Sequence, residues 1–65
     1  MTVTVNGRPH ETEAASLHDL LEELGFAGRK VATALNGDFV RASLRSETGL
    51  NDGDAVEVVV PMQGG

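Results

Sequence analysis

The chain has 65 residues, of which 40% are hydrophobic and none is cysteine, and its formal net charge is −5. This length allows one domain with a small core, and the lack of cysteine excludes a disulfide framework and thiol chemistry within the chain. Ten acids against five bases, with two aromatic residues, argue against nucleic acid as a partner. The N-terminal residues do not resemble a signal peptide, and no apolar run approaches the roughly 18 residues of a membrane span, so we expect a cytoplasmic protein without a membrane partner.

The first predicted element is a β-hairpin. Residues 2–5 alternate threonine with valine, and Asn6-Gly7 follows them directly. Both residues of an Asn-Gly pair tolerate the positive φ that a type I′ turn requires, so the chain should return as a second strand over residues 8–13. Pro9 has no N–H for the strand ladder, which places this return strand at a sheet edge.

A short amphipathic helix is predicted next. Ser16 is a suitable N-cap, and Asp19 three residues later makes an acidic variant of the capping box. Four leucines at positions i, i+3, i+4 and i+7 form one apolar stripe: Leu17, Leu20, Leu21 and Leu24. Gly25 is a natural residue to end the helix, which should be stable only when its leucine stripe packs against a sheet.

A second hairpin follows the helix. Residues 31–35 are predicted to form a strand, Asn36-Gly37-Asp38 a turn, and residues 39–41 a brief return strand.

The C-terminal third of the chain contains its strongest strand signal. Residues 42–50 have no clear hydrophobic period and are expected to be irregular. Residues 51–54 read Asn-Asp-Gly-Asp, a dense turn signal, and lead into a valine-rich strand over residues 55–60. Four valines in five positions predict a central strand that is buried on much of both faces. Pro61 should end the regular pairing.

This order of elements predicts an α+β protein with the β-grasp fold of ubiquitin, a mixed sheet of four or five strands with one main helix packed on one face. The last strand should lie beside the first and parallel to it. The leucine stripe would then pack against valines of these two strands, namely Val3, Val5, Val56 and Val58. We expect residues 1–60 to form the domain and residues 61–65 a flexible tail.

No catalytic or metal site is expected in the body of the domain. His10 and His18 are eight residues apart, a spacing that fits no standard metal site. The sequence has no nucleophile motif, phosphate-binding loop or Walker lysine, so we expect a protein that is not an enzyme and binds no cofactor itself.

The C-terminal residues Met62, Gln63, Gly64 and Gly65 are the candidate functional segment. Residues 61–65, fully extended, would reach roughly 16 Å beyond the final strand. Because glycine has no Cβ, Gly64 and Gly65, preceded by Gln63, could thread a partner's narrow active site. Two terminal glycines alone also fit a frayed end or a cloning remnant, but their place directly after the last strand of a β-grasp pattern favours a function.

The free carboxylate of Gly65 would be the reacting group. A carboxylate is an anion at neutral pH and has no good leaving group, so a partner must first convert it to an acyl adenylate with ATP. A sulfur nucleophile can then attack the carbonyl and leave a thiocarboxylate. Because the chain lacks cysteine, this sulfur must come from a separate donor.

These features resemble the ThiS-type sulfur carriers, part of the ubiquitin-like ThiS/MoaD family. The resemblance covers the whole chain and includes the Ser16-capped helix, residues 31–37, residues 50–54 and the ending at Gly64-Gly65. It implies that a ThiF-like, E1-like adenylyltransferase activates the C-terminus. It also implies that the thiocarboxylate, with sulfur from a sulfur-donating protein, serves a ThiG-like thiazole synthase of thiamine biosynthesis.

Partner contacts are expected on the sheet face that the helix leaves uncovered. Phe39 and Met62 are the candidate apolar anchors there, although Phe39 could instead fill a gap in the core. The acids Asp52, Asp54 and Glu57 could meet basic residues of the adenylating enzyme, and turn or solubility roles would explain them equally well.

Three other functions remain open at this point. Small subunits of molybdopterin synthase share the fold and the diglycine but are usually longer. A ubiquitin-like modifier would use the same activated carboxylate to form isopeptide bonds, although Lys30 as the only lysine leaves little scope for polymeric chains. A plain interaction domain would not need its tail at all.

Overall fold

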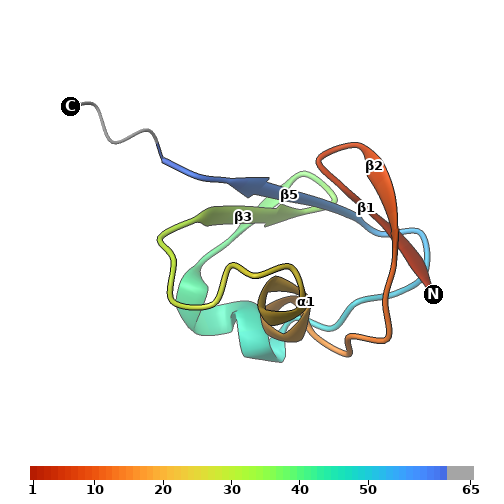
Figure 1. Cartoon of the computed structure of the whole chain (residues 1–65), viewed down its shortest axis with the longest axis horizontal. Coiled ribbons are helices and arrows are strands. Elements are labelled where there is room, and N and C mark those ends of the chain that lie inside the picture. The colour runs from red at the N-terminus through yellow and green to blue at the C-terminus, as the bar shows by residue number, and fades with distance from the viewer. Residues whose placement is uncertain (62–65) are drawn as a thin grey trace.

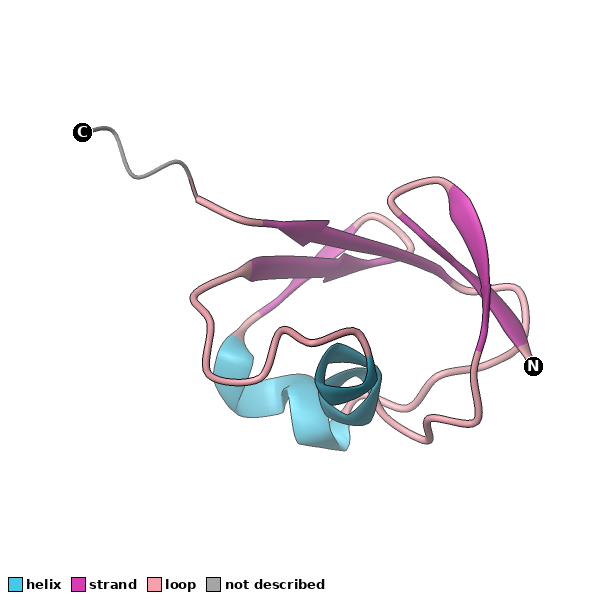
Figure 2. Cartoon of the chain, in the orientation of Figure 1, coloured by secondary structure: helices cyan, strands magenta, loops and turns pink. Residues whose placement is uncertain are grey.

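A computed structural model describes residues 1–61, which form one sheet with helical segments on one side of it (Figures 1 and 2). The strands are β1 (Thr2–Val5), β2 (Arg8–Glu11), β3 (Ala32–Leu35), β4 (Asp38–Val40) and β5 (Ala55–Val59). The helical segments are α1 (Leu17–Glu23) and the 3₁₀-helix η1 (Ala42–Glu47). The division into a domain of residues 1–60 and a tail of residues 61–65 stays a prediction.

The last strand of the chain lies at the centre of the sheet. The strand order is β2-β1-β5-β3-β4, with β5 parallel to β1 and antiparallel to β3. Figure 1 shows α1 crossing one face of this sheet. The mixed five-stranded sheet with one main helix confirms the predicted β-grasp fold.

Both hairpins turn at the predicted Asn-Gly pairs. Asn6 and Gly7 have φ values of 52° and 83°, and Asn36 and Gly37 have φ values of 50° and 87°, the positive angles of a type I′ turn. Each turn has two central residues, so β4 begins at Asp38, one residue earlier than predicted.

The edge position of β2 is confirmed, since this strand pairs only with β1 among the described residues and carries Pro9. It ends at Glu11, two residues before the predicted end. Directly after β2, the Thr12 hydroxyl accepts a hydrogen bond from the Ala14 N–H at 3.0 Å. This local side-chain bond is a feature of turns and ends the strand.

Helix α1 begins and ends where its capping residues predict. The Ser16 Oγ accepts a hydrogen bond from the Asp19 N–H at 3.2 Å, and Gly25, with φ of 87°, follows the C-cap Leu24. Leu17, Leu20 and Leu21 are buried, and Leu24 is half-buried against the core. The leucine stripe therefore faces the sheet as predicted.

The core lies between α1 and the face of the sheet that α1 covers. Its buried apolar residues are Val3, Ala14, Leu17, Leu20, Leu21, Leu50, Val56 and Val58. Val5 packs against this cluster while half-buried. The prediction that β5 is buried on both faces is wrong: Val56 and Val58 point into the core, whereas Val59 on the opposite face is 58% exposed. Within residues 1–61, only one face of the central strand is covered, because both helical segments lie on the same side (Figure 2).

Residues 42–50 are not irregular as predicted, because Ala42–Glu47 forms η1. Polar contacts fix this segment, since Arg45 donates to the buried hydroxyl of Thr33 at 3.0 Å and to the carbonyl of Val31 at 2.6 Å. The Thr33 hydroxyl in turn donates to the Val40 carbonyl at 2.7 Å. Anchoring through an arginine leaves no apolar stripe in the sequence, which explains why the periodicity did not indicate a helix.

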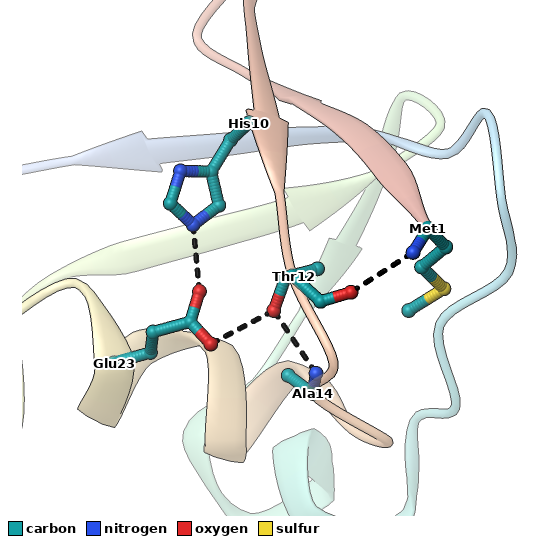
Figure 3. A network of polar contacts seen from close by, with 5 residues as sticks. All are labelled: Met1, His10, Thr12, Ala14 and Glu23. Carbon is teal, nitrogen blue, oxygen red and sulfur yellow. Dashed lines mark hydrogen bonds and ion pairs between the residues drawn. The ribbon is translucent and has the colours of Figure 1, made fainter.

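A polar network joins the end of α1 to the chain after β2 (Figure 3). One oxygen of Glu23 lies 2.6 Å from the Nε2 of His10, and the other accepts from the Thr12 hydroxyl at 2.9 Å. The Thr12 carbonyl accepts from the amino group of Met1 at 3.2 Å. The hydrogen bonds from His10 and Thr12 hold the pKa of Glu23 below its ordinary value. This network fixes β2 and the N-terminus to the helix.

Among the residues that the structure describes, no helix is long and apolar enough to cross a membrane.

Candidate functional site

Strand β5 leads directly to the candidate functional segment. It is paired on both sides, and its last residue, Val59, lies opposite Ala32, the first residue of β3. Val60 and Pro61 continue from it as the last residues that the structure describes. The predicted functional residues Met62, Gln63, Gly64 and Gly65 lie outside the described residues, so their roles stay predictions. The structure describes β5 and the two residues that follow it, which precede this segment in the chain.

Side chains of both hairpin turns bind the main chain of β5. Asn6 accepts from the Val58 N–H through Oδ1 at 2.8 Å and donates to the Val58 carbonyl through Nδ2 at 3.0 Å. Asn36 accepts from the Ala55 N–H through Oδ1 at 2.9 Å. The Asn-Gly pattern predicts the turn role of both asparagines but not these bonds to β5. The sequence signal for these bonds is the position of each asparagine, directly after a strand that neighbours β5.

The face of the sheet away from α1 carries an open apolar surface. A shallow hollow of about 210 Å³ is lined by residues of three strands, namely Ala32, Thr33, Ala34, Phe39, Glu57 and Val59. The Phe39 side chain is 73% exposed, so the alternative that it fills a core gap is wrong. This hollow, which we call the open face, reaches Val59 at the end of β5 and so adjoins the start of the C-terminal segment.

The three candidate acids separate into two with turn roles and one without. Asp52 accepts from the Thr2 N–H at 2.8 Å, and Asp54 accepts from the Asn51 N–H at 2.8 Å and from the Asn36 amide at 3.0 Å. The bonds from Asn36 and Asn51 hold the pKa of Asp54 below its ordinary value. These aspartates therefore hold the turn before β5. Glu57 is exposed within the open face, where a partner can reach it.

The two histidines lie in different surroundings. His10 belongs to the network with Glu23, whereas the Nε2 of His18 is 3.8 Å from Glu22 one helical turn further on. Within residues 1–61, potential ligand atoms of His18, Asp19 and Glu22 lie within 4.8 Å of one another, all on exposed side chains. Neither histidine lies on the open face.

These features define a ubiquitin-like β-grasp protein whose central strand ends at the open face and is followed in the sequence by a C-terminal diglycine. Comparison with known proteins gives the particular family. The model of the ThiS family matches residues 3–65. A sulfur carrier protein ThiS of Thermus thermophilus is 41% identical over 63 residues, which cover 97% of this chain and 98% of that protein.

Two further comparisons agree with this match. The crystal structure of a thiamine biosynthesis protein (ThiS) from Geobacter metallireducens superposes over the full length of both chains with a TM-score of 0.83 and 36% identity. A thiazole synthase of Paramagnetospirillum magneticum is 36% identical over 66 residues, and this chain spans 20% of its length. The chain belongs to the ThiS family.

Proposed function

We propose that this protein is a sulfur carrier of thiamine biosynthesis that holds the sulfur as a thiocarboxylate on Gly65. The observation that carries the proposal is that the ThiS family match continues through the diglycine to residue 65. The central strand β5 leads straight into that segment, so the body of the domain presents the reacting group.

The proposed chemistry has three steps. The Gly65 carboxylate attacks the α-phosphorus of ATP on an E1-like, ThiF-like adenylyltransferase, which gives an acyl adenylate and releases pyrophosphate. The outer sulfur of a protein persulfide then attacks the activated carbonyl, and AMP leaves with the bonding electron pair, which gives an acyl disulfide. A thiol of a partner attacks the donor's sulfur in this acyl disulfide, so that the thiocarboxylate leaves and the donor ends in a disulfide with that thiol. The chain has no cysteine, so a separate sulfur-donating protein must supply the sulfur.

The protein acts in this scheme as a co-substrate rather than as an enzyme. ATP and the sulfur donor are bound by its partners, and Gly64 and Gln63 enter the active site of the adenylyltransferase ahead of the body. Glycine suits this task because a residue without a Cβ passes through a narrow channel.

A ThiG-like thiazole synthase is the proposed acceptor of the sulfur. The match of the whole chain to one fifth of a thiazole synthase supports this choice, because a region like this chain occurs within that enzyme. It also favours the thiamine pathway over molybdopterin synthesis.

The open face is the proposed docking surface for these partners. Phe39 and Val59 supply exposed apolar area next to the start of the C-terminal segment, and Met62 would add to it. Aromatic and methionine side chains are effective anchors at interfaces. Glu57 within the same face can pair with a basic residue of the partner.

Mass spectrometry of the intact protein tests the proposal. Incubation with the cognate adenylyltransferase, ATP and a sulfur source should replace one oxygen by sulfur, and fragmentation should place the sulfur on Gly65. A variant that lacks Gly65 serves as the control and should keep its mass. An unchanged mass for the wild-type protein, with an enzyme that is active on another carrier, would contradict the proposal. Conjugates to lysines of other proteins would favour a modifier instead.

A further inference from the structure

The β1 side of strand β5 is held near its C-terminal end by a side chain instead of by a strand. The β1–β5 register covers Thr4 opposite Ala55 and Val5 opposite Val56, and the Asn6 N–H then donates to the Val56 carbonyl at 2.9 Å. At Asn6 the backbone turns away with φ of 52° toward β2. Its side chain nevertheless continues the line of β1 along β5.

The Asn6 carboxamide binds Val58 as a neighbouring strand would. It uses one acceptor and one donor for the N–H and the carbonyl of the same residue, at 2.8 Å and 3.0 Å. On the other side of β5, Val58 lies opposite Thr33 and Val59 lies opposite Ala32. The end of β5 is therefore held from both sides only while the Asn6 amide is present, within the part of the chain that the structure describes.

We propose that Asn6 is a positioning residue for the activation of the C-terminus: by holding both main-chain groups of Val58, it sets the direction in which β5 delivers the C-terminal segment to the activating enzyme. This inference rests on the proposed function and deepens it. Val58 precedes Pro61 by three residues, so a pivot at Val58 changes where the whole segment points.

The expected effect falls on turnover rather than on docking. The open face does not involve Asn6, and its candidate anchor Phe39 lies on β4, away from Val58, so docking to the enzyme should change little. A pivoting β5 end would place Gly65 less often within reach of the ATP phosphorus. Misplacement of a reacting group by about 1 Å can lower a rate by as much as about 10²-fold.

Asn36 provides a matched control on the same strand. It occupies the same place in the other Asn-Gly turn, with φ of 50°, and also binds a main-chain N–H of β5. Its target is Ala55, at the opposite end of the strand from the C-terminal segment. Asn6→Gly and Asn36→Gly both keep the positive φ without strain and remove one carboxamide, so they should lower stability similarly.

The test measures pyrophosphate release by the cognate adenylyltransferase at increasing concentrations of each full-length protein. We expect N6G to lower kcat by about tenfold with KM within about twofold of wild type, and N36G to leave both values within about twofold. Equal kcat values for N6G and N36G would overturn the positioning role alone. A wild-type protein that is not activated would overturn the proposed function, and the positioning role with it.

A second variant keeps the test decisive if N6G does not fold. Asn6→Asp preserves the turn and the bond from the Val58 N–H, but its carboxylate cannot donate to the Val58 carbonyl. We expect N6D to lower kcat by a factor between about two and about ten, with KM within about twofold of wild type. Amide hydrogen exchange at Val58 should stay close to that of wild type, because its N–H keeps an acceptor. A folded N6D protein with wild-type kcat would overturn the proposal.

Discussion

Phe39 is highly exposed and lines the same hollow as Val59, the last residue of β5, so its part in binding and its part in folding can be measured separately. A phenylalanine that is 73% exposed contributes little to folding, so its loss should leave the body of the domain intact. Buried in a partner interface, the same ring would contribute strongly to binding.

We therefore expect Phe39→Ser to raise the KM for the adenylyltransferase by about tenfold or more while the melting temperature stays close to that of wild type. Leu44→Ser is the control, because Leu44 is 44% exposed on η1, on the side of the sheet that carries α1. Initial rates and thermal unfolding of both variants check this. Equal KM values for F39S and L44S would rule out the open face as the docking surface.

Thr33 is the opposite case, a polar residue that is 2% exposed and whose hydroxyl joins β3, β4 and η1. Thr33→Val keeps the shape but removes the hydroxyl that donates to the Val40 carbonyl and accepts from the Arg45 Nε–H. We expect a loss of about 1–3 kcal/mol in the free energy of unfolding, measured by urea denaturation. Thr4→Val on β1, where the side chain is only half-buried, should cost less, and an equal loss would contradict the assigned role of Thr33.

At the scale of elements, the link between α1 and the chain after β2 depends on the ionised carboxylate of Glu23. His10 and Thr12 bind this carboxylate and hold its pKa below the ordinary value near 4.5. The folded protein thus binds the proton of Glu23 less readily than the unfolded chain does. The stabilisation is present above the ordinary pKa and is lost as the pH falls through the lowered one.

Glu23→Gln should remove this part of the pH dependence. Below the ordinary pKa of 4.5, the wild-type protein should lose stability more steeply than E23Q does, because the substituted amide takes up no proton in this range. Urea denaturation over a series of acid pH values measures this, and parallel curves for E23Q and wild type would contradict the role of the network.

The elements themselves could be predicted largely from local patterns. The two Asn-Gly turns, the Ser16 cap and the leucine stripe are short-range signals, and each formed where it was expected. Segment η1 could not be predicted, because Arg45 anchors it through polar bonds to residues 12 and 14 positions away in the chain. The second bonding role of Asn6 was missed for the same reason, since its partner Val58 is 52 residues away.

At the scale of the whole molecule, the β-grasp topology places the last strand at the sheet centre, next to both hairpins. This arrangement followed from the order of the elements, and the family resemblance is confirmed by the match over residues 3–65. That the helix covers one face of the sheet also followed from this order of elements. The burial of β5 did not follow from its valines, because a run of valines fits a strand that is covered on one face as well as one covered on both. The uncovered face of β5 is the feature that makes the open face available to a partner.

The central claim is that the body of the domain presents the free carboxylate of Gly65 for activation. One measurement tests it most directly: sulfur incorporation into the intact protein, compared between wild type and a variant with one alanine appended after Gly65. The appended residue follows Gly65 and adds to none of the contacts described for residues 1–61, so we expect both proteins to unfold at the same temperature. We predict that the wild-type protein gains sulfur and that the extended variant gains none. Equal incorporation into both proteins would contradict the account.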